Sequence, residues 1–236
     1  MLDDRRRNVP HLVLTYSRQL DDPHAKWHKL VYTDALARLG YELEIVHVPL
    51  LRAGKYASNG TIDGELSRVF EYGQGLKNLV RVQENATIIE FSAFASQDIR
   101  HVNEWKHIPD IAQSAIYRRG VKTVSAHLMQ QFEPDSLITV NTVAQALDAL
   151  SLNRGLVYVD VKNSVLNTLH YDQADHEDWQ HIHELGVVST NTTHVWLNKK
   201  HEVLAHQLSK ILIAMKQAGD FERYRQQLGI ADDALK

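Results

Sequence analysis

Residues 50–68 read LLRAGKYASNGTIDGELSR, and this stretch combines a short helical segment, a turn and several charges. The helix is predicted for Leu50–Asn59, and Gly60 ends it because glycine readily adopts the left-handed conformation found at helix ends. Asp63 and Gly64 favour a tight turn. The stretch therefore predicts a helix that is followed by a sharply turned, charged segment.

The charged residues of this stretch are candidates for ligand contact. The guanidinium of Arg52 or Arg68 matches two oxygens of a carboxylate or phosphate, and Glu65 can accept a hydrogen bond from an amine or a hydroxyl. The alternative is that Glu65 and Arg68 form an internal ion pair that fixes the loop. The sequence leaves both interpretations open.

Strands and helices alternate on both sides of this stretch, which is typical of α/β units with mostly parallel sheets. An irregular polar segment, Ser96–Asp110, divides two such series and predicts two α/β lobes. Asp22 is the expected N-cap of the first helix. The expected strands are Leu12–Tyr16, Tyr41–Val48, Leu79–Val82, Thr87–Phe94, Val121–Val124, Leu137–Val140, Leu156–Val161 and Gly186–Thr190, with a brief apolar stretch at Val195–Leu197. The expected helices are Pro23–Leu39, Leu50–Asn59, Ser125–Phe132, Val143–Leu150, Leu204–Met215 and Phe221–Leu228.

The composition narrows the classes of function. The chain has 236 residues, a net charge of −3 and no long basic run, which argues against nucleic acid as its main partner. It has no cysteine, which excludes disulfides, thiol catalysis and thiolate-bound zinc. No apolar run approaches the roughly 20 residues that cross a bilayer, and the first residues lack the apolar segment of a signal peptide. We therefore expect a chain that is not itself transmembrane and whose signal, if it is exported, has been removed.

Three blocks, in the same order, resemble the periplasmic solute-binding protein superfamily of type II, in its family-3 (amino-acid-binding-like) group. The first block is Arg52–Arg68, continued by Asn78–Val82 and Glu90–Phe94. The second is Thr142–Asp160, in which a helix leads through Asn-Arg-Gly to an apolar strand that ends in aspartate. The third is Thr193–Gly219, a return strand followed by the closing helix. Together the blocks cover most of the chain.

The resemblance implies an α/β fold of two-lobe, type II periplasmic-binding-protein architecture. Each lobe is then a mostly parallel sheet flanked by helices, with a ligand cleft between the lobes. Lobe 1 is expected to contain residues 1–93 and 188–236, and lobe 2 residues 94–187. Two strand crossovers, near 91–94 and 187–190, are expected to act as the hinge.

The function that the resemblance implies is that of a non-catalytic, periplasmic solute-binding protein. We expect a monomer without a cofactor, which captures a small polar ligand, an anion among the candidates, for a membrane transporter. One alternative is the ligand-sensing domain of a membrane receptor. Another is a dehydratase-like enzyme on the same fold, with Glu65 and Asp160 as general acid and base. A fourth is an interaction module whose cleft has lost its ligand.

The sequence departs from the amino-acid binders of this group at one position. Those proteins carry an arginine shortly before the strand that contains Phe91 and Ser92, and it clamps the ligand carboxylate in a bidentate pair. In this chain, the stretch from Val82 to Glu90 contains no arginine. The departure speaks against ordinary α-amino-acid binding.

Further candidates for ligand contact lie near predicted strand ends, and each has a structural alternative. Tyr16, which ends the first strand with Ser17, could equally pack in the core. Arg118 and Arg119 could form a solvated basic loop, and Asp160 could cap the segment that follows it. Asn141 and Thr142 have the form of a capping box with Gln145. The complete set of expected ligand-binding residues is Tyr16, Arg52, Glu65, Arg68, Ser92, Arg119, Gly120, Asn141, Thr142 and Asp160.

Fourteen histidines raise the question of a metal site. The densest group is His176, His181 and His183, and Asp175 and Glu184 could complete a zinc site. The stretch is polar and loop-like, so we interpret these side chains as solvated surface residues and expect no metal.

Overall fold

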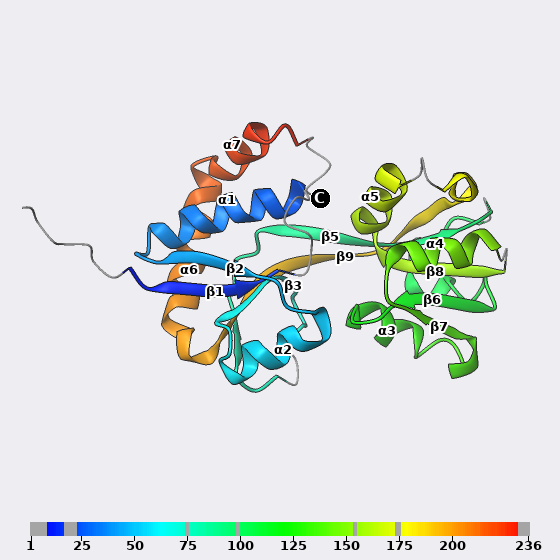
Figure 1. The fold of residues 1–236 in the computed structure, drawn as a ribbon, viewed down its shortest axis with the longest axis horizontal. Coiled ribbons are helices and arrows are strands. Elements are labelled where there is room, and N and C mark those ends of the chain that lie inside the picture. Colours follow the sequence, from blue (N-terminus) through cyan, green and yellow to red (C-terminus); the bar gives the residue numbers. More distant parts are fainter. Residues whose placement is uncertain are drawn as a thin grey trace, which may run out of the picture. The chain divides into compact units, whose positions relative to one another are not determined.

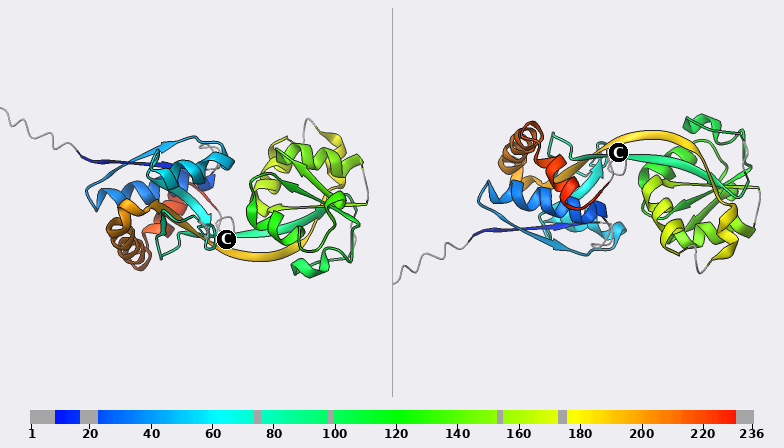
Figure 2. Two further views of the ribbon diagram at one scale, coloured as in Figure 1. Left: turned by 90° about the horizontal axis from the view of Figure 1, so that it is seen from below. Right: turned by 90° about the horizontal axis from the view of Figure 1, so that it is seen from above.

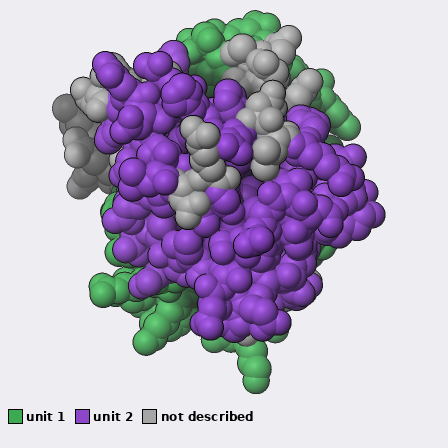
Figure 3. Space-filling model, turned by 90° about the vertical axis from the view of Figure 1, so that its right-hand side faces the viewer, with its two compact units in different colours: residues 1–88, 192–236 green, residues 89–191 purple. Residues whose placement is uncertain are grey.

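The computed structural model describes residues 9–16, 23–73, 76–97, 100–152, 155–172 and 176–230. Ser17, Asp22 and Asp175, which the sequence analysis singled out, lie outside the described residues. The chain divides into two compact units (Figures 1 and 3). Unit 1 comprises residues 1–88 and 192–236, and unit 2 comprises residues 89–191.

The sheet of unit 1 is built on three parallel strands. These are β1 (His11–Thr15), β2 (Glu42–Val46) and β3 (Gly64–Val69), with β1 in the middle. The antiparallel strand β9 (His183–Asn198) pairs with β3, and β4 (Leu79–Arg81) pairs with β9. Because β1, β2 and β3 run in one direction, their carboxyl ends lie at one edge of the sheet.

Two apolar layers cover the two faces of this sheet. On one face, Leu12 and Leu14 pack with α1 (Pro23–Ala37) and α6 (Glu202–Gln217). The intervening Val13 packs with α2 (Leu50–Asn59) on the other face, as the alternation of side chains along a strand requires. Figure 1 shows α1 and α2 on opposite sides of the sheet, with α7 (Asp220–Gln227) beside α1.

Unit 2 also has a parallel core. Strands β6 (Ser114–Arg118), β7 (Leu137–Val140) and β8 (Leu156–Val161) are parallel, and β5 (Thr87–Ala95) is antiparallel to β8. The apolar cluster on one face draws on α4 (Val143–Leu152) and α5 (Lys162–Asp172), through Leu147, Leu150 and Val165 among others. The remaining elements of unit 2, among the residues that the structure describes, are α3 (Lys122–Leu128) and short 3₁₀ turns at Trp105–His107, Pro134–Ser136 and Glu177–His181. A further 3₁₀ turn, Lys199–His201, lies in unit 1.

Strands β5 and β9 each contain residues of both units. They are neighbours in the sheet and run side by side in each view (Figures 1 and 2). The units change over after residues 88 and 191, whereas the expected lobes changed over after 93 and 187. A hinge in these strands remains a prediction.

The elements differ from the expectation in several places, and β3, β6 and α5 were not among the expected elements. Val121–Val124 was expected to be a strand because of its β-branched residues, but α3 begins at Lys122, since Val124 and Leu128 lie one turn apart and are both buried. The segments around Gly186 and Val195 are parts of the single strand β9. The region after Asp63 is strand β3, where the sequence suggested only a turn.

Candidate functional site

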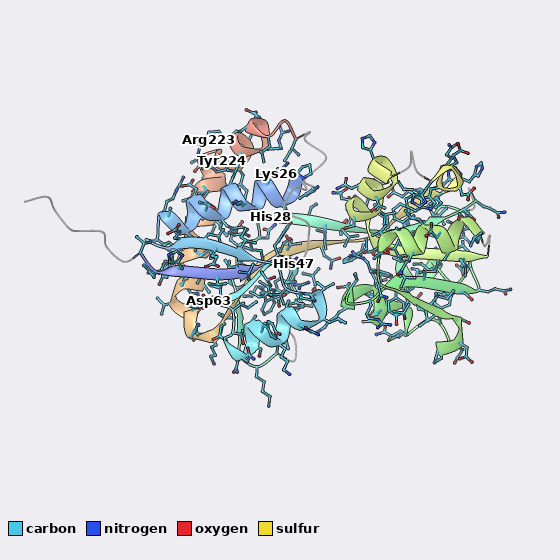
Figure 4. All side chains as sticks on the ribbon, in the orientation of Figure 1. Lys26, His28, His47, Asp63, Arg223 and Tyr224 are labelled. Carbon is cyan, nitrogen blue, oxygen red and sulfur yellow. The ribbon has the colours of Figure 1, made fainter. Side chains whose placement is uncertain are left out.

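The carboxyl edge of the parallel strands of unit 1 gathers polar side chains from three strand ends. Tyr16 follows β1 directly, and His47, which is exposed, follows β2. Arg68 is the penultimate residue of β3. Ligands of open α/β sheets bind outside the carboxyl ends of the strands, so this edge is the first candidate site. Figure 4 labels His28 and His47 in this part of unit 1.

A β-bulge in β3 brings Glu65 and Arg68 onto one side of the strand. Three positions separate them on β3, but their partners on β9, Trp196 and His194, are only two positions apart. The bulge therefore lies between Glu65 and Arg68, and within it Ser67 has a left-handed backbone conformation, with φ of 56°. In a regular strand residues three apart point to opposite faces, so the bulge is what allows the pair to form.

The Glu65 carboxylate is the centre of this cluster and is completely buried. Arg68 donates from Nε at 2.7 Å and from Nη2 to Oε2, and the Tyr72 hydroxyl donates to Oε1 at 2.6 Å. Burial, together with the Glu65 carboxylate, raises the pKa of Tyr72 well above its ordinary value, so the phenol remains a donor. The Arg68 side chain is 11% exposed, and its Nη1 has no hydrogen-bond partner among the described residues.

Unit 2 contains a second cluster of the same composition. Arg118 ends β6, and its Nε and Nη2 donate to Oδ2 and Oδ1 of Asp160 at 2.7 and 3.0 Å. The Tyr158 hydroxyl also donates to Oδ2, and the backbone N–H of Val161 donates to Oδ1 at 2.6 Å. Asp160 and Tyr158 are completely buried, whereas the Arg118 side chain is 23% exposed. The Tyr158 hydroxyl also interacts with the Arg118 guanidinium.

The electrostatics of the second cluster favour the charged guanidinium. Burial by itself lowers the pKa of Arg118, but the carboxylate of Asp160 outweighs this effect and raises it. Burial and the same carboxylate raise the pKa of Tyr158 well above its ordinary value. The arginine therefore stays cationic and the tyrosine stays protonated throughout the physiological range of pH.

Ser92 lies next to this cluster, opposite Asp160 in the pairing of β5 with β8. Its hydroxyl donates to Glu184 at 2.8 Å, and Lys162 lies 3.1 Å from Glu184 and 3.5 Å from Glu90. Burial lowers the pKa of Lys162, but the two carboxylates outweigh it and raise the pKa. Every carboxylate of this group is thus already paired with a cation of unit 2.

The remaining expected residues do not join these clusters. Arg52 on α2 and Arg119 after β6 are exposed, and neither side chain forms an ion pair or hydrogen bond with another described residue. Gly120 adopts a left-handed backbone, with φ of 91°. Thr142 Oγ1 accepts from the N–H of Gln145 at 3.2 Å, and the Gln145 side chain accepts from the N–H of Asn141 at 2.9 Å. This is the capping arrangement that the sequence offered as the structural alternative.

Tyr16 belongs to a buried polar chain. Its hydroxyl lies 3.1 Å from Nδ1 of His28, and Nε2 of His28 lies 3.3 Å from Oγ1 of Thr87. Thr87 Oγ1 in turn lies 2.8 Å from Oγ1 of Thr193. This row of hydrogen-bonded side chains extends from the end of β1 to β5 and β9, the two strands that contain residues of both units. Tyr16 is therefore packed in the core, which was the alternative to ligand contact.

Sequence reasoning missed four residues of the two clusters: Tyr72, Tyr158, Lys162 and Glu184. It also preferred Arg119 to Arg118, whereas Arg118 is the one that contacts Asp160. One signal was available for Tyr158, because residues two apart on a strand share a face and Asp160 follows at that spacing. Lys162 and Glu184 gave no such signal.

No group of three or more metal-binding side chains is close enough together, within the described ranges, to hold a metal ion. His176 instead stacks on Trp179 at 3.9 Å between ring centroids. No helix of the described residues is long and apolar enough to span a membrane.

Comparisons with known proteins give relatives in sequence and in structure, and no family model matches the chain. An uncharacterized protein of Shewanella oneidensis (strain ATCC 700550 / JCM 31522 / CIP 106686 / LMG 19005 / NCIMB 14063 / MR-1) is 29% identical over 225 residues. The match covers 94% of this chain and 83% of that protein.

Two solved structures are similar over nearly the whole chain. A histidine kinase sensor domain with similarity to periplasmic binding proteins has a TM-score of 0.73 at 14% identity, covering 94% of this chain and 97% of its own. A substrate-binding protein of an ABC uptake transporter from Streptococcus pneumoniae, with bound histidine, has a TM-score of 0.70 at 14% identity. The match covers 96% of this chain and 95% of that protein's chain. The chain therefore has the type II periplasmic-binding-protein fold, and this prediction is confirmed.

Proposed function

We propose that this chain is a non-catalytic binding protein for a small anionic solute, and that Arg68 of unit 1 and Arg118 of unit 2 are the candidate anion-binding groups of their units. The observation that carries the proposal is the pair of arginine clusters at the carboxyl ends of strands, one in each unit. In each cluster a buried carboxylate holds the guanidinium, and the arginine side chain stays partly exposed, by 11% for Arg68 and by 23% for Arg118.

The arrangement suits recognition better than stability. Replacing a buried ion pair by apolar groups is often neutral or stabilising, so such pairs are weak evidence for a stabilising role. A guanidinium that is fixed at Nε and Nη2 still offers N–H donors at Nη1, and its orientation is set before the ligand arrives. An anion would therefore meet a donor whose side chain has little rotamer entropy left to lose.

The role of a solute-binding protein for a membrane transporter in the periplasm belongs to the same proposal. It is supported by the fold and by the similar structure from an ABC uptake transporter. The arginine clusters are argued from each unit taken separately.

The sensor-domain alternative is supported by the similar histidine kinase structure. Both roles require the same ligand-binding fold, so the chain itself does not separate them. The full-length gene product does: a transmembrane helix followed by a signalling domain would identify a receptor, and a free-standing exported chain would identify a partner of a transporter.

The dehydratase-like alternative required Glu65 and Asp160 as general acid and base. Each carboxylate instead accepts hydrogen bonds from an arginine and a tyrosine. A general base must lie within hydrogen-bond reach of the proton that it abstracts, and both carboxylates are completely buried among their own donors. We therefore propose binding without turnover, and the absence of any product after prolonged incubation with a bound ligand would support it.

The test is a thermal-shift screen with organic acids, amino acids and phosphorylated small molecules, followed by calorimetry on each hit. A ligand at 100 times its dissociation constant stabilises the folded state by about 2.7 kcal/mol, which raises the melting temperature by a few degrees. Arg68→Lys and Arg118→Lys keep the positive charge but lose the planar guanidinium that can bind two oxygens at once. Each should weaken binding of the anion at least tenfold. Lys210→Ala, a change at an exposed residue of α6, should bind as the wild type does.

Two results would contradict the proposal. One is that no anion shifts the melting temperature of the wild-type protein. The other is that both arginine variants, shown to be folded by circular dichroism, bind the hit as tightly as Lys210→Ala does.

A further inference from the structure

We infer that the ligand carries one or more anionic groups and no ammonium group, so that the chain selects a deaminated organic acid over the corresponding amino acid. The inference rests on the proposed function and names its substrate class. Its basis is the state of the carboxylates at the candidate site, because an α-amino acid needs an acceptor for its ammonium group as well as a donor for its carboxylate.

The Asp160 carboxylate has no acceptor position left. A carboxylate offers about four lone-pair positions on its two oxygens. In unit 2, Oδ2 accepts from Arg118 Nε and from the Tyr158 hydroxyl, and Oδ1 accepts from Arg118 Nη2 and from the N–H of Val161. All four donors belong to the same unit, and the side chain is completely buried. A ligand ammonium would have to break one of these bonds.

The Glu65 carboxylate of unit 1 is similarly engaged. Oε2 accepts from both Nε and Nη2 of Arg68, and Oε1 accepts from the Tyr72 hydroxyl. The carboxylate is completely buried, behind an Arg68 side chain that is itself only 11% exposed. The group that a ligand meets first is therefore the guanidinium, which repels an ammonium and attracts an anion.

The partly exposed carboxylates of unit 2 are paired as well. Glu184 and Glu90 share the ammonium of Lys162, at 3.1 and 3.5 Å, and Glu184 also accepts from Ser92. A ligand ammonium would compete with Lys162 for these oxygens. An anion, in contrast, is attracted by the partly exposed guanidinium of Arg118 and does not have to displace Lys162.

The sequence adds an independent argument. The similar structure from Streptococcus pneumoniae holds histidine, an α-amino acid. In this chain, the arginine expected shortly before β5 is missing, and the arginines at the strand ends are Arg68 and Arg118, each already bound to a carboxylate. The chain therefore has arginine donors for an anion, whereas the carboxylates beside them already accept hydrogen bonds from residues of the chain itself.

The experiment is calorimetry of the wild-type chain with three matched pairs of probes that differ in the ammonium group. The pairs are succinate with L-aspartate, glutarate with L-glutamate, and propionate with L-alanine. We expect at least one pair in which the deaminated member binds ten or more times tighter than the amino acid. Tyr158→Phe frees one acceptor position on Asp160 without changing the charge, and it should narrow that difference severalfold.

The outcomes separate the two proposals. If the amino acid of a pair binds as tightly as its partner or tighter, the inference is overturned and anion binding stands. If no member of any pair binds, and inorganic phosphate and citrate do not bind either, both proposals are overturned. If Tyr158→Phe folds and leaves the preference for the deaminated acid unchanged, the assignment of the discrimination to Asp160 is overturned. If the circular-dichroism spectrum shows that Tyr158→Phe is unfolded, the test is repeated with Lys162→Gln. This variant removes the cation that pairs with Glu184 and Glu90, and it should also narrow the preference.

Discussion

Arg118 and Asp160 lie 42 positions apart in the sequence and meet through two hydrogen bonds, from Nε to Oδ2 at 2.7 Å and from Nη2 to Oδ1 at 3.0 Å. The pairing of the parallel strands β6 and β8 sets this contact, because Tyr117 lies opposite Val159 and the next residues therefore adjoin. The contact places a cation at the carboxyl edge of unit 2, and the buried carboxylate fixes its orientation.

Removing the carboxylate should destabilise unit 2 strongly. Asp160→Ala leaves a guanidinium that is only 23% exposed without its partner, and loss of one member of a buried pair costs about 3–5 kcal/mol of unfolding free energy. Urea denaturation at neutral pH measures the change. Glu104→Ala serves as the control, because its pair with Lys106 is exposed and its loss should leave stability nearly unchanged. Equal midpoints for the two variants would contradict a buried pair.

The cap of α4 gives a prediction that separates two roles of Thr142. Its Oγ1 accepts from the N–H of Gln145 at 3.2 Å, so Thr142→Ala should lower the unfolding free energy by about 1 kcal/mol. Thr142→Ser keeps the acceptor and should restore most of that loss. If Thr142→Ala also weakens ligand binding more than tenfold while Thr142→Ser does not, Thr142 contacts the ligand in addition to capping the helix.

Part of the fold was predictable, because β1, β2, β7 and β8 are short apolar runs that glycine, proline or capping residues delimit, whereas β3 and β6 were not among the expected strands. Leu137–Val140 and Leu156–Val161 were predicted with the bounds that the structure has. The 16-residue strand β9 was not, because its middle, around Asn191 and Thr193, is polar and interrupts the apolar pattern. That polar part lies where the strand passes from one unit to the other, so local hydrophobicity does not report it.

For the candidate site, the sequence predicted some of the residues but not the contacts between them. The sequence singled out Glu65, Arg68 and Asp160, but the partner of Asp160 depends on the register of β6 against β8. Similarly, the ion pair of Glu65 with Arg68 depends on a bulge at Ser67, and no single-residue propensity signals it. Pairing register and bulges are tertiary features, which is why the neighbouring Arg119 looked the better candidate.

The buried threonine pair at the boundary of unit 1 should behave as one unit energetically. Thr87 and Thr193 lie 2.8 Å apart between their hydroxyls, and Thr193 Oγ1 donates to the carbonyl of Thr87 at 3.2 Å. Thr87→Val removes one hydrogen-bond contact from the hydroxyl of Thr193 and one from the ring of His28, so it should cost about 1–3 kcal/mol.

A double-mutant cycle checks the coupling. The variant that carries both Thr87→Val and Thr193→Val should lose at least 0.5 kcal/mol less than the sum of the single changes, because neither hydroxyl is then left unpaired. Thermal and urea denaturation give the same comparison. Strict additivity would show that the two hydroxyls do not depend on each other.

Asp63 should make stability depend on acidic pH. Its Oδ1 accepts from Lys200 Nζ and from His201 Nε2, both at 2.7 Å, and its Oδ2 accepts from the N–H of Val13 at 2.9 Å. Burial alone raises the pKa of this carboxyl, but the hydrogen bonds from Lys200, His201 and Val13 outweigh it and hold the pKa below its ordinary value. The folded state therefore binds this proton less readily than the unfolded state does.

The sign of the effect follows from that difference. The stabilisation by Asp63 is complete above the unfolded pKa of about 3.9, and it is lost as the pH falls through the lower folded value. Asp63→Asn should thus be less stable than the wild type by roughly 1–3 kcal/mol at pH 7, and the gap should close below about pH 4. Urea denaturation at pH 7, 5, 4 and 3 measures it. A gap that is the same at every pH would show that the amide is disruptive for steric reasons, and that the charge of Asp63 contributes nothing to the stability of unit 1.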